Sequence, residues 1–154
     1  MLTDNFSELE NLRLAKMQQL RQNGIEPYPT RSYKNSNNAD AIRAFEAREA
    51  AGEAEELRLT LAGRLRAIRN MGKLSFAHIE DRTGKMQLFL RVNELGQEKL
   101  DPFVRYFDLG DFIEATGVMV RTKRGEVTLQ VEDFRMLSKA LYQLPAAKDE
   151  VVDG

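Results

Sequence analysis

Residues 57–92, LRLTLAGRLRAIRNMGKLSFAHIEDRTGKMQLFLRV, decide the fold of this chain. Apolar and polar residues alternate along most of the stretch, and a period of two is typical of half-buried β-strands. The alternation is interrupted after Arg69 and again at the tight turn Arg82–Lys85, which contains a glycine. The stretch therefore predicts three consecutive strands, over 57–69, 73–81 and 86–92.

Two further strands are predicted downstream. Residues 94–107, ELGQEKLDPFVRYF, lose the alternation and predict a short helix. DFIEATGVMVRT (111–122) and EVTLQVEDFRML (126–137) predict a hairpin around the turn Lys123–Gly125. Three strands, a helix and a hairpin form the element order of a mainly β OB-fold, a five-stranded Greek-key barrel. Gly63 and Gly117 fall inside strands, where a small barrel has to bend sharply.

An α-helical extension is predicted ahead of the barrel. Ser7 and Glu10 match a capping box, and Leu9, Leu12, Met17 and Leu20 form an apolar stripe that ends at Gly24. Arg13, Lys16 and Arg21 make one side of this helix basic, either as a solvated face or as a contact for an RNA backbone. Residues 25–38 read as a linker, and residues 39–56 as a second helix that acts as a spacer. We therefore predict an extension over 1–56, a barrel over 57–145 and a connector over 146–154.

The composition of the chain limits the classes of protein to which it can belong. The chain has 154 residues, of which 42% are hydrophobic, so we expect a folded protein. It contains no cysteine, no apolar leader and no apolar run of membrane-spanning length. We therefore expect a cytoplasmic protein that does not have a membrane as a partner. The formal net charge is −1, but residues 57–145 hold 15 Lys and Arg against 11 Asp and Glu. The barrel is therefore moderately basic between acidic flanks.

The second strand carries the main functional question. Leu74, Phe76, His78 and Glu80 share one face, whereas Ser75, Ala77, Ile79 and Asp81 share the other. Alternation alone does not decide which set is inward, but a small set such as Ser75, Ala77 and Ile79 suits a tight interior. In the third strand, Met86, Leu88 and Leu90 read as core. The opposite side then carries Gln87, Phe89 and Arg91.

An exposed Phe76 with Gln87 and basic neighbours suits single-stranded RNA, because rings stack bases and Lys or Arg hold phosphates. Each residue also has a plainer interpretation. Phe76 would be a core residue, and His78 would be a structural residue held by hydrogen bonds. Glu126 would be a surface charge beside a turn. A solvated strand edge would account for Arg64, Arg66 and Arg69. One histidine and no cysteine argue against a metal site, and no nucleophile, acid–base pair or phosphate loop indicates catalysis. The chain therefore reads as a binding module, not an enzyme.

AGRLRAIRNMGKLSFAHIEDRTGKMQLFL and the later LGDFIEATGVMVRTKRGEVTLQVEDFRMLSKALYQLP closely resemble the anticodon-binding domain of class II lysyl-tRNA synthetases. The N-terminal LRLAKMQQLRQNGIEPYP resembles the opening helix of that family. The resemblance covers roughly residues 9–145. MGKLSF, DLGD, RTKRGE and LSKAL together are specific to it, although aspartyl- and asparaginyl-tRNA synthetases share the barrel.

The resemblance implies residue roles. Phe76 would stack on an anticodon base of tRNA-Lys, and Arg69, Gln87 and Glu126 would recognise the central uridine, with Arg64 as a nearby candidate. His78 lies at a position where the family varies, and we expect only a contact with a flanking base from it. Weaker contacts to phosphate are expected from Arg66, Lys73, Lys123 and Arg124.

The chain ends where the catalytic domain of the family, with its ATP, lysine and Mg²⁺ motifs, would begin. We expect an excised part of a longer ligase rather than a stand-alone paralogue. The parent would be an ATP- and Mg²⁺-dependent homodimer that attaches lysine to tRNA, while this part needs no cofactor. Two alternatives remain open: a sequence-tolerant single-strand-binding OB protein, and an assembly module whose basic strip docks an acidic protein surface.

Overall fold

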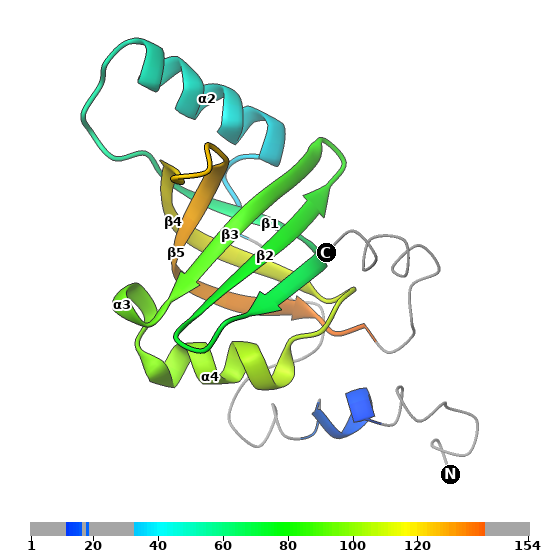
Figure 1. Ribbon diagram of the computed structural model, residues 1–154. Coiled ribbons are helices and arrows are strands. Elements are labelled where there is room, and N and C mark those ends of the chain that lie inside the picture. Colours follow the sequence, from blue (N-terminus) through cyan, green and yellow to red (C-terminus); the bar gives the residue numbers. More distant parts are fainter. Residues whose placement is uncertain (1–11, 17, 19–32, 141–154) are drawn as a thin grey trace.

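The barrel predicted from the alternating pattern is confirmed. The computed structural model describes residues 12–16, 18 and 33–140 (Figure 1). Its strands are β1 (Arg58–Asn70), β2 (Leu74–Asp81), β3 (Gly84–Arg91), β4 (Phe112–Arg121) and β5 (Val127–Ser138). They close into a barrel in the order β1-β2-β3-β5-β4. All neighbours pair antiparallel except β3 and β5, whose short parallel contact closes the barrel.

One face of each strand fills the barrel interior. On β2, Ser75, Ala77 and Ile79 are at most 1% exposed, which settles the direction that alternation left open. The neighbouring strands contribute large apolar side chains that are almost fully buried, namely Leu61, Leu65, Met86, Leu88, Leu90, Ile113, Leu129 and Met136. Phe76 and His78 are therefore on the outside of the barrel, as the small inward residues had suggested.

Ala67 faces outward, although it continues the alternation that places Leu61 and Leu65 in the interior. A β-bulge interrupts the β1–β2 register between Leu65 and Ala67, so Ala67 pairs with outward His78, and Ile68 pairs with inward Ala77. A bulge inserts one extra residue into the strand, so the side chains after it point to the opposite face of the sheet from the one that strict alternation predicts. As a consequence, Arg69 pairs with Phe76 on the outer surface.

Both strand glycines lie where strands approach closely. A Cβ on Gly117 would come within 2.0 Å of the Gln130 carbonyl oxygen, and one on Gly63 within 2.9 Å of the Glu80 carbonyl oxygen. Gly117 adjoins a second register shift, between Thr116 and Gly117. The glycines thus allow the barrel to bend, as the sequence indicated.

Helices close the two ends of the barrel (Figure 1). Helix α2 (Asn38–Ala50) is capped by the Asn37 side chain and ends well before Glu56, so the predicted span of 39–56 is too long. The chain turns away from the helix axis at Gly52, which has φ +71°. The predicted helix over 94–107 is two helices, α3 (Val92–Leu95) and α4 (Gln97–Tyr106), because Gly96 has φ +80° between them.

Two residues of the predicted basic side of the N-terminal helix, Arg13 and Lys16, contact the segment between α4 and β4. Residues 12–16 and 18 are helical. Arg13 is 6% exposed and donates to the Leu109 carbonyl oxygen at 3.3 Å, while Lys16 pairs with Asp108 at 2.9 Å. Leu12, expected in the apolar stripe, is 61% exposed instead. The predicted capping box, the remaining stripe, Arg21, Gly24 and the connector lie outside the described residues.

Two sequence motifs meet in a buried ionic cluster below the barrel. Lys139 of LSKAL has a fully buried side chain, and its Nζ lies 2.7 Å from both Asp108 Oδ2 and Asp111 Oδ2 of DLGD. Burial by itself raises the pKa of Asp108, but hydrogen bonds and charge from Lys139, and then Lys16, outweigh it and hold that pKa below its usual value. The cluster therefore joins the segment between α4 and β4, the residue that follows β5 and the N-terminal helix. No helix among the described residues is both long and apolar enough to cross a membrane.

Candidate nucleic-acid interface

An outer strip on β2 and β3 brings aromatic and polar side chains together. Phe76 lies opposite Phe89, and His78 lies opposite Gln87, so these four side chains occupy two neighbouring cross-strand positions on one face. We call Phe76, His78, Gln87 and Phe89, with Arg69 beside them on β1, the outer strip. Its polar residues had been predicted from the sequence as separate candidates, and the register makes them neighbours.

The two phenylalanine rings form a parallel stack. Their centroids are 4.7 Å apart and the ring planes differ by 3°. The Arg91 guanidinium lies over Phe89, 5.1 Å from its centroid, and Arg91 is held by Glu94. Phe89 was assigned no role from the sequence, because its contact with Phe76 depends on the β2–β3 register. Among the described residues, no other ring or guanidinium lies over Phe76.

Glu126 completes a polar cluster beside the rings. His78 Nε2 lies 3.1 Å from Glu126 Oε2. The Gln87 amide, oriented with its nitrogen toward this carboxylate, donates to Glu126 Oε1 at 2.7 Å. The three candidates Gln87, His78 and Glu126 are therefore in direct contact, although they come from three different strands or turns. The cluster offers amide donors and carboxylate acceptors side by side.

The turn that carries Glu126 is fixed at several points. Glu126 N donates to Thr122 Oγ1 at 3.2 Å, and Arg121 Nη1 donates to the Gly125 carbonyl oxygen at 2.6 Å. Arg121 is itself held by two 2.8 Å hydrogen bonds to Glu49 of α2. The interpretation of residues 39–56 as a mere spacer therefore misses that α2 supports this turn.

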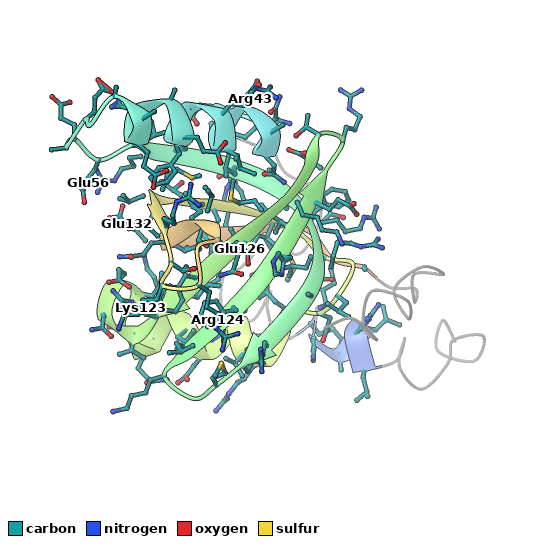
Figure 2. All side chains as sticks on the ribbon, turned by 45° about the horizontal axis from the view of Figure 1, so that its top comes forward. Arg43, Glu56, Lys123, Arg124, Glu126 and Glu132 are labelled. Atoms are coloured by element: carbon teal, nitrogen blue, oxygen red, sulfur yellow. The ribbon has the colours of Figure 1, made fainter. Side chains whose placement is uncertain are left out.

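Basic residues surround the outer strip. Lys123 and Arg124 are exposed on the β4–β5 turn, and Figure 2 shows them with Glu126 on the side of the barrel where β2 and β3 lie. Lys73 is exposed in the β1–β2 turn, next to the Phe76 end of the strip. These three exposed cations make the surroundings of the outer strip basic.

Arg64 and Arg66 lie elsewhere on the surface. Arg64 pairs with Glu80 in the β1–β2 register, and its guanidinium covers the Phe112 ring at 4.5 Å. Arg66 Nε lies 3.5 Å from Glu80 Oε1, and its side chain is only 13% exposed. Neither arginine joins the Gln87–His78–Glu126 cluster. They line a separate depression beyond Glu80.

The outer strip and Glu126 combine an aromatic surface with polar groups that can form hydrogen bonds. Stacked rings bind flat ligands, while Arg69, Gln87 and Glu126 offer donors and an acceptor to the edge of such a ligand. Within the described residues, no group of three or more His, Cys, Asp or Glu is arranged to hold a metal ion.

Comparison with known proteins gives a consistent family. A family model named tRNA anti-codon, described as an OB-fold nucleic acid binding domain, matches residues 59–137. A lysine–tRNA ligase of Thermotoga sp. (strain RQ2) is 38% identical over 140 residues, which cover 91% of this chain and 28% of that protein. Lysine–tRNA ligases of Clostridium novyi (strain NT) and Roseiflexus sp. (strain RS-1) are 36% and 39% identical, over 91% of this chain and 26% and 28% of theirs.

The chain thus spans about a quarter of the length of the curated relatives that it matches. The family model extends from the second residue of β1 to the last but one of β5, and so covers nearly all of the barrel. The chain therefore belongs to the tRNA anti-codon family of OB-fold nucleic acid binding domains and is homologous to lysine–tRNA ligases.

Proposed function

We propose that this chain binds the anticodon loop of tRNA-Lys and reads its central uridine. The observation that carries the proposal is the contact between Gln87 and Glu126 beside the Phe76–Phe89 stack. The ring stack offers a surface for one base, and the Gln87 amide and Glu126 carboxylate beside it offer a donor and an acceptor for the edge of that base. The similarity to lysine–tRNA ligases supports tRNA-Lys as the RNA that is bound.

The central uridine stacks on Phe76, and polar groups read its edge. Uridine presents carbonyl oxygens, which accept from Arg69 and Gln87, and an N3–H, which donates to the Glu126 carboxylate. Cytidine has an unprotonated N3 in place of that donor, so Glu126 would face a lone pair. A mispaired buried polar edge costs about 1–3 kcal/mol.

Neighbouring groups contact the rest of the loop. His78 contacts a flanking base, and Lys73, Lys123 and Arg124 contact phosphates. These contacts add affinity and salt dependence but little sequence preference. In the free protein the Glu126 carboxylate already accepts from His78 and Gln87. Uridine therefore meets an acceptor that is held in position before binding.

The wider context is also a proposal. The parent is a class II lysine–tRNA ligase that uses ATP and Mg²⁺, functions in the cytoplasm and forms a homodimer. In that protein, residues 1–56 form the N-terminal extension, 57–145 the anticodon-binding barrel, and 146–154 a connector to the catalytic domain. The relatives support this reading because the chain matches about a quarter of their length.

A titration with two RNA hairpins tests the proposal. The anticodon stem-loop of tRNA-Lys is compared with the same hairpin carrying cytidine at the central position, at one salt concentration. We expect the uridine hairpin to bind about 5- to 150-fold more tightly, corresponding to 1–3 kcal/mol. Equal affinities would favour a sequence-tolerant single-strand-binding protein, and no binding to either would favour a protein-docking module.

A further inference from the structure

A depression on the outer surface of β1, beyond the outer strip, has the form of a second binding site. It has a volume of about 470 Å³, within the usual range for small-ligand sites. Its wall comes from β1, the β2–β3 turn, the start of β4 and the segment before α2. The residues that shape it chemically are Lys34, Arg64, Arg66, Glu80, Arg82 and Phe112. We call it the Arg64 pocket.

The Arg64 pocket is electropositive. Four basic side chains line it against two carboxylates, Glu80 and Asp81. Both carboxylates are already engaged, since Glu80 pairs with Arg66 at 3.5 Å and Asp81 accepts from the Thr83 backbone N–H at 2.8 Å. Among the described residues, no carboxylate forms an ion pair with Arg64 or Arg82. The pocket therefore favours an anion.

Its position relates it to the outer strip. Phe76, His78 and Glu80 follow one another on the same face of β2. At about 3.3 Å per residue, Glu80 lies about 13 Å along the strand from Phe76. Neighbouring bases stacked in one strand of a helix are only about 3.4 Å apart, so the pocket receives a different nucleotide from the one on Phe76.

We infer that the Arg64 pocket binds a second nucleotide of the same RNA strand, held mainly through its phosphate. This inference rests on the proposed anticodon-loop function. Arg64 and Arg82 supply forked guanidinium donors, which suit phosphate oxygens. The flat Arg64 guanidinium, packed on Phe112 at 4.5 Å, gives the sugar and base a planar surface on which to stack. The RNA strand then runs along β2, from the rings past Glu126 to the pocket.

Amide-resolved NMR titration with the anticodon stem-loop tests the path of the RNA. We expect shifts at Phe76 and Gln87 together with shifts at Gly63, Arg82 and Phe112. Shifts confined to the Phe76 and Gln87 region would overturn the Arg64 pocket and leave the proposed function intact. An absence of shifts in both regions would overturn both.

Charge variants test the contact itself. Arg64→Gln/Arg82→Gln should weaken binding about tenfold and reduce the slope of log affinity against log salt by about 0.7–1.4, or 0.7 per phosphate contact. Arg82→Gln alone, in an exposed turn, should give about half that change in slope without disturbing Phe112. Arg43→Gln removes an exposed α2 charge outside the pocket and should leave the slope unchanged. Equal slopes for all four proteins, wild type included, would overturn the pocket.

Discussion

The ring of Phe76 on β2 stacks on the ring of Phe89 on β3, with 4.7 Å between their centroids. Both side chains are half-buried on the outside of the barrel, opposite the inward Ala77 and Leu88. Phe89 therefore supports Phe76 from the side of β3 and restricts its rotation. A ring held in this way loses little freedom when a base stacks on it, so its contact area converts efficiently into affinity.

Replacing Phe76 by alanine should separate binding from folding. We expect Phe76→Ala to lower RNA affinity about 5- to 150-fold, the 1–3 kcal/mol typical of base–aromatic stacking. The free energy of unfolding should fall by only about 1–2 kcal/mol, because the lost ring stack is half-exposed. Urea unfolding and hairpin titration of the same preparation measure the two effects.

Phe103→Ala is the matched control for this experiment. Phe103 is fully buried and contacts the rings of Phe107 and Phe134. Its truncation should cost about 3–5 kcal/mol of stability and leave the affinity of the folded fraction unchanged. If Phe76→Ala loses stability on the scale of Phe103→Ala and keeps its affinity, Phe76 is a core residue and no platform exists.

Glu126→Gln should remove the preference for uridine. The amide can donate or accept, so it suits the N3 atom of either pyrimidine, and the uridine-to-cytidine affinity ratio should fall to within about threefold. Paired hairpin titrations give the ratio. Glu132→Gln removes an exposed β5 carboxylate that pairs with Arg58 at 2.8 Å, and should keep the wild-type ratio. A ratio that survives in Glu126→Gln would assign discrimination to other groups.

The sequence predicts the barrel well, because inward and outward residues alternate for most of each strand. The features that the sequence does not reveal depend on strand register and on contacts between residues that are far apart in the chain. The bulge after Leu65 moves Arg69 to the outer surface, and its only local trace is the adjacent apolar pair Ala67–Ile68. The contact between Gln87 and Glu126 joins residues from different parts of the chain. Likewise, Lys16 reads as a surface charge until its partner Asp108, 92 positions later, is known.

Lys139→Met should destabilise the protein strongly. Lys139 is buried between Asp108 and Asp111, and removing one partner leaves carboxylates buried without their cation. The expected loss in the free energy of unfolding is about 3–5 kcal/mol. Lys99→Met breaks the exposed pair with Asp133 and should cost at most about 1 kcal/mol. Similar urea midpoints for the two variants would show that the cluster contributes no more than a surface pair.

Asp81→Asn should flatten the dependence of stability on acidic pH. Burial by itself raises the pKa of Asp81, but hydrogen bonds from Thr83, Asn38 and Gly84 outweigh it and lower that pKa below its usual value. A carboxyl whose folded pKa is lowered adds stability above its unfolded pKa of about 3.9, and this stability is lost as pH falls through the folded pKa. Urea midpoints at pH 7 should therefore be lower for Asp81→Asn than for wild type, and the difference should shrink below about pH 4. Thr83→Val removes one of the donors and should give an intermediate curve. A constant difference between wild type and Asp81→Asn across this range would show that ionised Asp81 does not stabilise the turn.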